Sequence, residues 1–181
     1  THRQSSAASD VYKRQVTMIK YKFLTFILFL SITFSASLIG GLATINFKEP
    51  WYSLLNKPFF NPPDWIFGPV WTILYFMMAI SIWIFWHVKN RDIKTVYIYF
   101  IQLFFNTTWS VVFFIFHELF LALIILIILI ILIINLVLRL RRVKMLSAYL
   151  MIPYLLWCCF ALILNTNSVS YTHLTLPTIV G

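Results

Sequence analysis

The sequence predicts an all-α integral membrane protein built as a bundle of five transmembrane helices. Hydrophobic residues make up 61% of its 181 residues and charged residues 10%, which leaves too little polar surface to cover a soluble domain. Five stretches lack Asp, Glu, Lys and Arg, and each is roughly 20 residues long, enough for a helix to cross a hydrocarbon core of about 30 Å. They are 23–45, 65–87, 96–116, 119–138 and 145–164.

The first stretch also has the basic flank and small residues of a signal peptide. Its apolar part is longer than the core of about 7 to 15 residues found in such peptides, so we predict a retained helix. Small residues recur four apart on it, which allows a second helix to approach closely, either within the chain or from another subunit. These pairs are Ala36 with Gly40 and Ser37 with Gly41.

The connection after the first stretch is crowded with prolines and aromatic residues. Pro58, Pro62 and Pro63 predict a rigid and extended chain. The second helix is expected to begin at Pro69, because proline at the first helical position loses only an N–H that would have no partner there. The aromatic side chains expected to lie over the entrance of a pocket are Trp51, Phe59, Phe60 and Trp65.

Polar and aromatic residues share one face of the third stretch and one face of the fifth. Their helical spacing predicts that both faces point into the bundle. Interhelical hydrogen bonding and ligand contact are both open explanations for the amides. The two sets are Gln102, Asn106, Trp109 and Phe113, and Tyr154, Trp157, Ala161 and Asn165.

The fourth stretch is apolar on every side apart from Asn135. This pattern is typical of a helix that faces lipid over most of its circumference. It is therefore the stretch least expected to line a site.

The two ends of the chain differ from the rest in composition. Residues 1–17 and 169–181 are polar and lack amphipathic periodicity, so we expect them to be non-native or disordered tails. The domain expected from the sequence is 18–168.

Basic residues are distributed unequally around the predicted helices. All of the 14 Lys and Arg residues except Lys48 and Lys57 fall on one side, which predicts a cytoplasmic amino terminus and a carboxyl terminus outside. A multi-pass protein of a bacterial inner membrane fits this pattern. The net charge of +9 is then a topology signal, and no nucleic-acid partner is expected.

Several kinds of chemistry have no support in the sequence. The predicted spans hold no ionisable acid or base in their interiors, which argues against ion-coupled transport. No spacing of His, Cys or carboxylates predicts a metal site or firm catalytic residues. Cys158 and Cys159 are adjacent on a helix and point about 100° apart, so no disulfide is expected between them.

Three segments, in this order and spacing, resemble the TspO/MBR family of tryptophan-rich sensory proteins, relatives of the mitochondrial translocator protein or peripheral benzodiazepine receptor. They are WYSLLNKPFFNPPDWIFGPVWTILY, QLFFNTTWSVVFF and PYLLWCCFALILN. The resemblance spans 23–165 and implies a five-helix bundle that is often dimeric. It also implies a pocket near the first connection that takes porphyrins or haem as ligands, sterols in some members, and synthetic benzodiazepine-site ligands, with no cofactor required.

The family motifs and the inward faces together give the candidate ligand-binding residues. Phe60 stands where many members have tryptophan, and the aromatic and basic pattern that marks sterol binding in animal members is absent after Asn165, so sterol binding is not expected. The candidate residues are Trp51, Phe60, Trp65, Trp71, Tyr75, Gln102, Asn106, Trp109, Trp157 and Ala161.

Three functions follow from the resemblance. The first is a membrane sensor or regulator that binds a tetrapyrrole, since aromatic walls with few polar groups suit a flat macrocycle. The second is an enzyme that degrades porphyrin with light and oxygen, in which Trp71 and Trp157 would be the catalytic residues. The third is a passive carrier of porphyrin or lipid.

Overall fold

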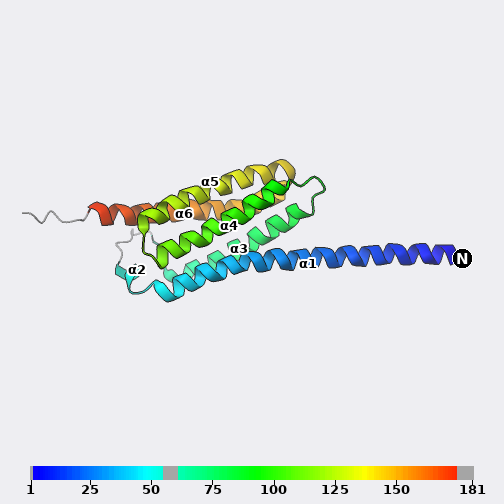
Figure 1. Cartoon of the computed structure of the whole chain (residues 1–181), viewed down its shortest axis with the longest axis horizontal. Coiled ribbons are helices and arrows are strands. Elements are labelled where there is room, and N and C mark those ends of the chain that lie inside the picture. Colours follow the sequence, from blue (N-terminus) through cyan, green and yellow to red (C-terminus); the bar gives the residue numbers. More distant parts are fainter. Residues whose placement is uncertain (1, 55–60, 175–181) are drawn as a thin grey trace, which may run out of the picture.

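The computed structural model describes residues 2–54 and 61–174, and side chains from 11 onward and up to 170 within those ranges. Every regular element in the described chain is helical (Figure 1). Five helices are long and apolar enough to cross a membrane, which confirms the predicted fold class. The elements are α1 (His2–Phe47), α2 (Trp51–Leu54), α3 (Asp64–Trp86), α4 (Ile93–Phe114), α5 (Leu119–Val143) and α6 (Met145–Leu174).

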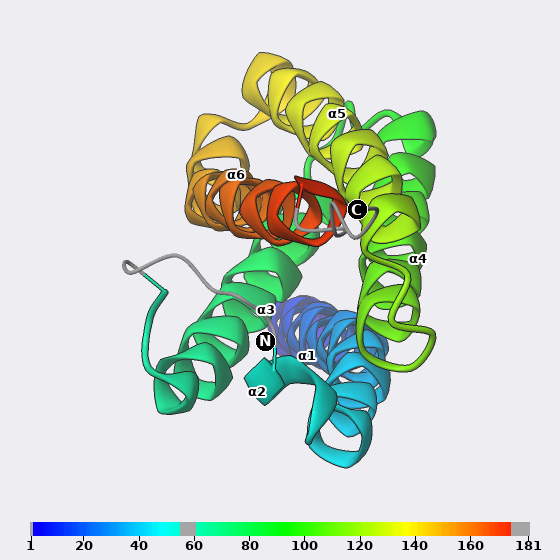
Figure 2. The ribbon, with the colours of Figure 1, turned by 90° about the vertical axis from the view of Figure 1, so that its left-hand side faces the viewer.

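The five long helices form a closed ring. Their main contacts run from α1 to α3, α6, α5, α4 and back to α1, and Figure 2 shows this ring end-on. Helices that are adjacent in sequence are therefore not always adjacent in space, because α3 and α4 touch only weakly. One consequence is that α1 lies between α3 and α4, while α5 lies on the opposite side of the ring.

The α1–α4 contact depends on a glycine. A Cβ atom at Gly40 would lie 3.0 Å from Oγ of Ser110, so a larger residue there would require the Ser110 side chain to move. The small pair Ala36 and Gly40 thus has its partner within the chain. A Cβ atom at Gly41 would meet nothing within 4 Å.

Interhelical hydrogen bonds connect the ring inside its apolar core. Asn106 of α4 accepts a hydrogen bond from Tyr75 of α3 and donates one to Tyr154 Oη of α6, at 2.9 Å. Tyr99 and Thr33 are hydrogen-bonded between α4 and α1 at 2.6 Å. These side chains are buried, so their polar atoms would otherwise lack partners in an apolar environment.

Helix α5 buries one stripe of residues and exposes the remainder. Its buried side chains recur every three or four residues and face the ring, whereas the other apolar side chains point outward. The buried stripe consists of Ala122, Ile125, Leu126, Leu129, Ile130, Ile133, Leu136 and Leu140.

The start of the second membrane helix was predicted wrongly. Helix α3 begins at Asp64 instead of Pro69, and Pro69 lies inside it. Pro63, with φ −57° and ψ 142°, ends the extended connection, and Ile66 N–H donates to its carbonyl at 3.0 Å. Asp64 in the first turn favours this earlier start because its charge complements the positive end of the helix dipole.

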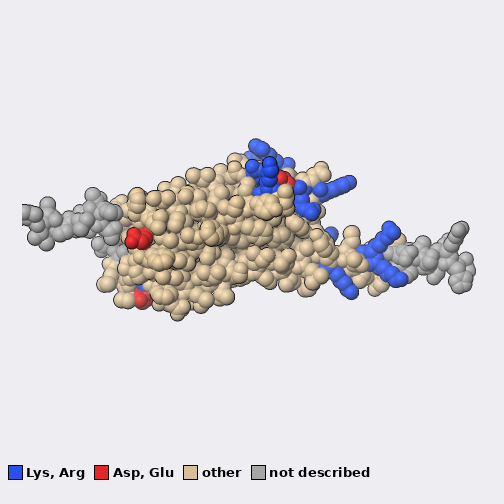
Figure 3. Space-filling view, viewed as in Figure 1, with Lys and Arg blue, Asp and Glu red and all other residues tan. Residues whose placement is uncertain are grey.

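The outermost helices run past the predicted domain limits, since α1 begins at His2 and α6 ends at Leu174. The domain limits of 18 and 168 stay predictions. At one end of the ring lie the α3–α4 and α5–α6 connections, and Figure 3 shows that Lys and Arg gather there and along the amino-terminal part of α1. Helix α2 and the α4–α5 connection lie at the other end.

Candidate functional site

A cavity of about 570 Å³ opens at the α2 end of the ring. Its walls come from α1, α3, α4 and α6, together with α2 and the chain that precedes α3. No residue of α5 lines it, as predicted for the fourth apolar stretch. The volume lies within the range of about 300 to 1,000 Å³ that is common for small-molecule sites.

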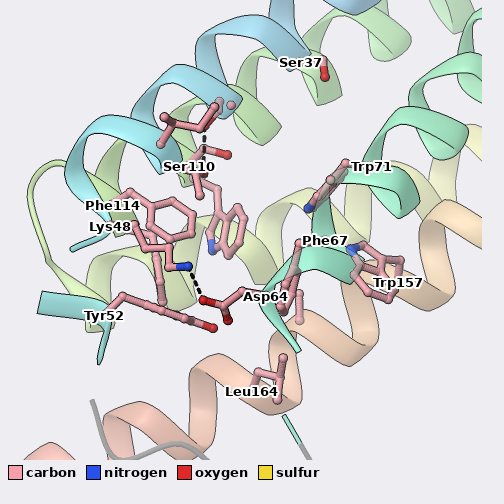
Figure 4. A pocket seen from close by; sticks show the side chains of 18 of the residues that line it. Ser37, Lys48, Tyr52, Asp64, Phe67, Trp71, Ser110, Phe114, Trp157 and Leu164 are labelled. Atoms are coloured by element: carbon pink, nitrogen blue, oxygen red, sulfur yellow. Dashed lines mark hydrogen bonds and ion pairs between the residues drawn. The ribbon is translucent and has the colours of Figure 1, made fainter. Parts of the chain in front are cut away.

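Aromatic side chains of α3 and α6 form one wall of the cavity (Figure 4). The ring centroids of Trp71 and Trp157 lie 6.4 Å apart with perpendicular planes, and Phe67 lies 5.9 Å from Trp157. Tyr75 continues the wall one turn deeper, with its ring 5.6 Å from Trp71. These positions share a wall because Phe67, Trp71 and Tyr75 are four apart on α3.

Asn106 supports this wall from behind instead of lining the cavity. It does not border the open space, but its amide holds the hydroxyl groups of Tyr75 and Tyr154. The ring of Tyr154 in turn packs 6.2 Å from Trp71. The amide is therefore used for interhelical hydrogen bonding and orients aromatic residues that contact the cavity.

The facing wall combines small residues of α1 with aromatic residues of α4. Gly41 of this wall and Gly68 of α3 face open space, since a Cβ atom at either position would meet nothing within 4 Å. Room for a flat ligand thus exists where these two glycines replace larger side chains. The other lining residues of this wall include Ser37, Gly40, Thr44, Trp109, Ser110, Phe113 and Phe114.

Two lining residues carry buried polar atoms that have no hydrogen-bond partner among the described residues. These are the indole N–H of Trp109 and both amide atoms of Asn165. Such groups normally find a partner, because leaving them unpaired costs about 1 to 3 kcal/mol. They are the candidate hydrogen-bonding groups within the apolar part of the site.

A polar group of residues, here called the mouth cluster, borders the outer end of the cavity. Lys48 forms an ion pair with Asp64 and lies 3.7 Å from Oε1 of Glu49. Burial is the main cause that raises the pKa of the Tyr52 phenol above its usual value, while a hydrogen bond with Asn61 opposes this shift. The mouth cluster consists of Lys48, Glu49, Tyr52, Asn61 and Asp64.

The structure brings most of the predicted site residues together. Trp65, Trp71, Tyr75, Trp109, Trp157 and Ala161 all line the cavity. Trp65 stands at its rim, with 74% of its surface exposed. Phe60 and Phe59 lie outside the described residues.

Two further predicted residues do not line the cavity. Trp51 stacks on His117 at 4.3 Å and meets Phe113 edge-on at 5.4 Å, so it fastens α2 to the end of α4. Gln102 is fully buried and lines no part of the cavity, and its amide has no partner in the described part of the chain. Helical spacing predicted that the Gln102 side chain points into the bundle, but not how far along the bundle it lies from the cavity.

Sequence reasoning missed the mouth cluster and the α1 wall. The small residues of α1 were recognised as a packing surface, yet only their position in the ring shows that Gly41 and Thr44 border open space. Lys48 and Asp64 are 16 residues apart, and no helical periodicity connects them. The proline-rich connection between them was the available signal, since it must bring the end of α1 back toward α3.

The lining determines what the site can do chemically. Its ionisable Lys, Asp and Glu side chains lie at the mouth, and the inner walls are aromatic or small. No group of three His, Cys, Asp or Glu side chains suited to a metal exists within the described residues. The arrangement is suited to holding a flat apolar molecule by stacking.

Comparison with known proteins gives matches to a single family. The sequence model of the TspO/MBR family matches residues 27–170. The tryptophan-rich protein TspO of Chlorobaculum tepidum is 34% identical over 149 residues, which cover 78% of this chain and 92% of the relative. The tryptophan-rich sensory protein of Cereibacter sphaeroides is 30% identical over 77% of this chain and 86% of its own length. The human translocator protein is 31% identical over 64% of this chain and 70% of its own length.

Proposed function

Because the chain belongs to the TspO/MBR family, we propose that this integral membrane protein binds a tetrapyrrole, porphyrin or haem, as a sensor or regulator. The observation that carries the proposal is the aromatic-walled cavity of about 570 Å³ between α1, α3, α4 and α6. A relative is named a sensory protein and another a translocator protein.

The walls match the chemistry of a macrocycle. A tetrapyrrole has two large apolar faces, and aromatic rings gain about 0.5 to 1.5 kcal/mol from offset or edge contacts beyond the burial of their area. Trp71 and Trp157 present their rings at right angles, so one can lie against a face while the other meets an edge. Gly41 of α1 leaves space on the facing wall, and Gly68 leaves space beside Trp71 on α3.

The orientation proposed from the sequence determines on which side of the membrane the cavity would open. Lys and Arg residues gather at the end of the ring away from the cavity, which favours the cytoplasm for that end. The cavity then opens on the outer side of a bacterial inner membrane. A ligand would reach it from that side or from the outer leaflet.

A second candidate function is light- and oxygen-dependent breakdown of the bound porphyrin. The observation that favours it is the contact of two indoles, Trp71 and Trp157, with the phenols of Tyr75 and Tyr154 nearby. Side chains of these kinds can be oxidised beside an excited ligand. Product analysis of the illuminated complex separates breakdown from binding alone.

Binding is tested by titrating the full chain, reconstituted in nanodiscs, with a porphyrin and following the quenching of tryptophan fluorescence. The proposal predicts saturable quenching with one porphyrin per chain. Quenching that rises linearly with porphyrin and matches empty nanodiscs supplemented with free tryptophan would contradict it.

A further inference from the structure

Lys48 and Asp64 join two helices at the mouth of the cavity (Figure 4). Lys48 continues the last turn of α1, where its N–H donates to the carbonyl of Thr44 at 3.0 Å. Asp64 occupies the first turn of α3. A cation near a helix carboxyl end and an anion near a helix amino end are each favoured by the helix dipole. The helix dipoles therefore favour both charges at the positions where they form their ion pair.

Lys48 also has hydrogen-bonding capacity that a ligand can use. Its ammonium carries three N–H donors, and the hydrogen bond to Asp64 uses one of them. The side chain is 22% exposed, compared with 49% for Asp64, so its ammonium is only partly surrounded by solvent. Among the described residues it is the one Lys or Arg that lines the cavity.

We propose that Lys48 is the specificity-determining residue of the cavity and selects ligands that carry a carboxylate on the rim of a flat apolar body. Asp64 positions the ammonium and competes with the carboxylate of the ligand. This inference rests on the proposed function, because it assigns the acidic group of the ligand to the mouth and its apolar body to the aromatic walls.

The charges of the described mouth residues favour this role for Lys48 with an acidic ligand. Glu49 and Asp64 both lie beside Lys48, so the charged residues of the mouth cluster are two carboxylates and one ammonium. Without Lys48 an incoming carboxylate would meet two like charges and, among the described residues that line the cavity, no compensating Lys or Arg. Removing one carboxylate instead would leave the ammonium more available.

The test compares a dicarboxylic porphyrin with its dimethyl ester on the full chain in nanodiscs of zwitterionic lipid. Each variant is compared with the unaltered chain for each probe, so that differences in membrane partitioning cancel. Lys48→Met should weaken binding of the dicarboxylic acid about three- to tenfold and leave the ester within about twofold, because a partly exposed charged contact has that magnitude. Asp64→Asn should strengthen binding of the acid about two- to fivefold and leave the ester unchanged.

Two further variants complete the design. Lys89→Met removes an exposed lysine at the other end of the ring and should change the affinity for neither probe. Glu49→Gln removes the other carboxylate near Lys48 and should strengthen acid binding less than Asp64→Asn, which keeps the test valid if Asn at 64 impairs folding.

The outcomes separate this inference from the function on which it rests. If both probes bind and their affinity ratio is the same in Lys48→Met as in the unaltered chain, Lys48 does not select the acid and the inference is wrong. An equal loss of affinity for the acid and the ester in Lys48→Met would mean that Lys48 has only a structural role, and the inference would be wrong. If neither probe binds the unaltered chain, the proposed function itself fails and this inference with it.

Discussion

Asn106 donates a hydrogen bond of 2.9 Å to the hydroxyl of Tyr154, and the same amide accepts one from Tyr75. One buried side chain of α4 thereby ties together α3 and α6, the two helices that carry the aromatic wall. The geometry of the cavity consequently depends on a residue that does not line it.

Asn106→Leu should lower the stability of the bundle by about 1 to 3 kcal/mol, because it leaves two buried phenols without their partner. Tyr154→Phe removes one hydrogen bond and should cost less, near the average of about 0.6 kcal/mol for such contacts in membranes. Equilibrium unfolding in mixed micelles measures both. Equal stability of Asn106→Leu and the unaltered chain would show that the amide is not structural.

Asn165→Leu should behave in the opposite way. Both amide atoms of Asn165 are buried and have no partner among the described residues, so an apolar replacement removes an unpaired polar group. We expect unchanged or higher stability in the same unfolding assay. A loss comparable to that of Asn106→Leu would reveal a structural hydrogen bond for Asn165.

Gly40 and Gly41 provide a matched pair of substitutions. Gly41→Leu places its side chain in open space and should reduce porphyrin affinity by about tenfold or more while leaving the bundle stable, since it fills the cavity. Gly40→Leu crowds the Ser110 side chain at the α1–α4 contact and should destabilise the bundle by about 1 to 3 kcal/mol. Thermal unfolding and porphyrin titration on both variants distinguish them, and identical behaviour would refute the assignment of Gly41 to the cavity.

The orientation can be tested with reporter fusions. A fusion ending after Asn46 should report an external location, and one ending after Asn90 a cytoplasmic location, because basic residues follow α3 and lie in the amino-terminal part of α1. Paired alkaline phosphatase and green fluorescent protein fusions measure this. The reverse pattern would invert the proposed topology.

Hydropathy alone was enough to predict the five membrane helices, since a span has a fixed length and must be apolar. The spacing of Trp157 and Ala161 predicted a shared inward face on one helix, and the resemblance to the family's motifs indicated Trp71 and Tyr75; all four line the cavity. Hydropathy and helical spacing are properties of single helices that do not depend on how the helices are arranged.

Properties that depend on the arrangement of helices were beyond the sequence. Gln102 and Trp109 share a helical face, yet the first lies deep in the ring and the second at the cavity, because the cavity occupies only one end. Trp51 was assigned to the pocket from its position in an aromatic segment, but its ring stacks on His117, in the connection between α4 and α5. The early start of α3 at Asp64 was missed because Pro69 appeared to be the stronger helix signal.

The central claim is that a porphyrin lies against the wall formed by Trp71 and Trp157. Trp83→Phe is the matched control, because Trp83 packs on Phe26 and His87 at the other end of α3. The decisive measurement is the porphyrin affinity of Trp71→Phe, Trp157→Phe and Trp83→Phe in nanodiscs, with products analysed after illumination. Each indole of the wall should contribute about 0.5 to 1.5 kcal/mol, so binding should weaken roughly two- to thirteenfold in the first two variants and stay unchanged in the third. Intact binding with abolished breakdown would favour the enzyme, and unchanged affinity in both wall variants would contradict the account.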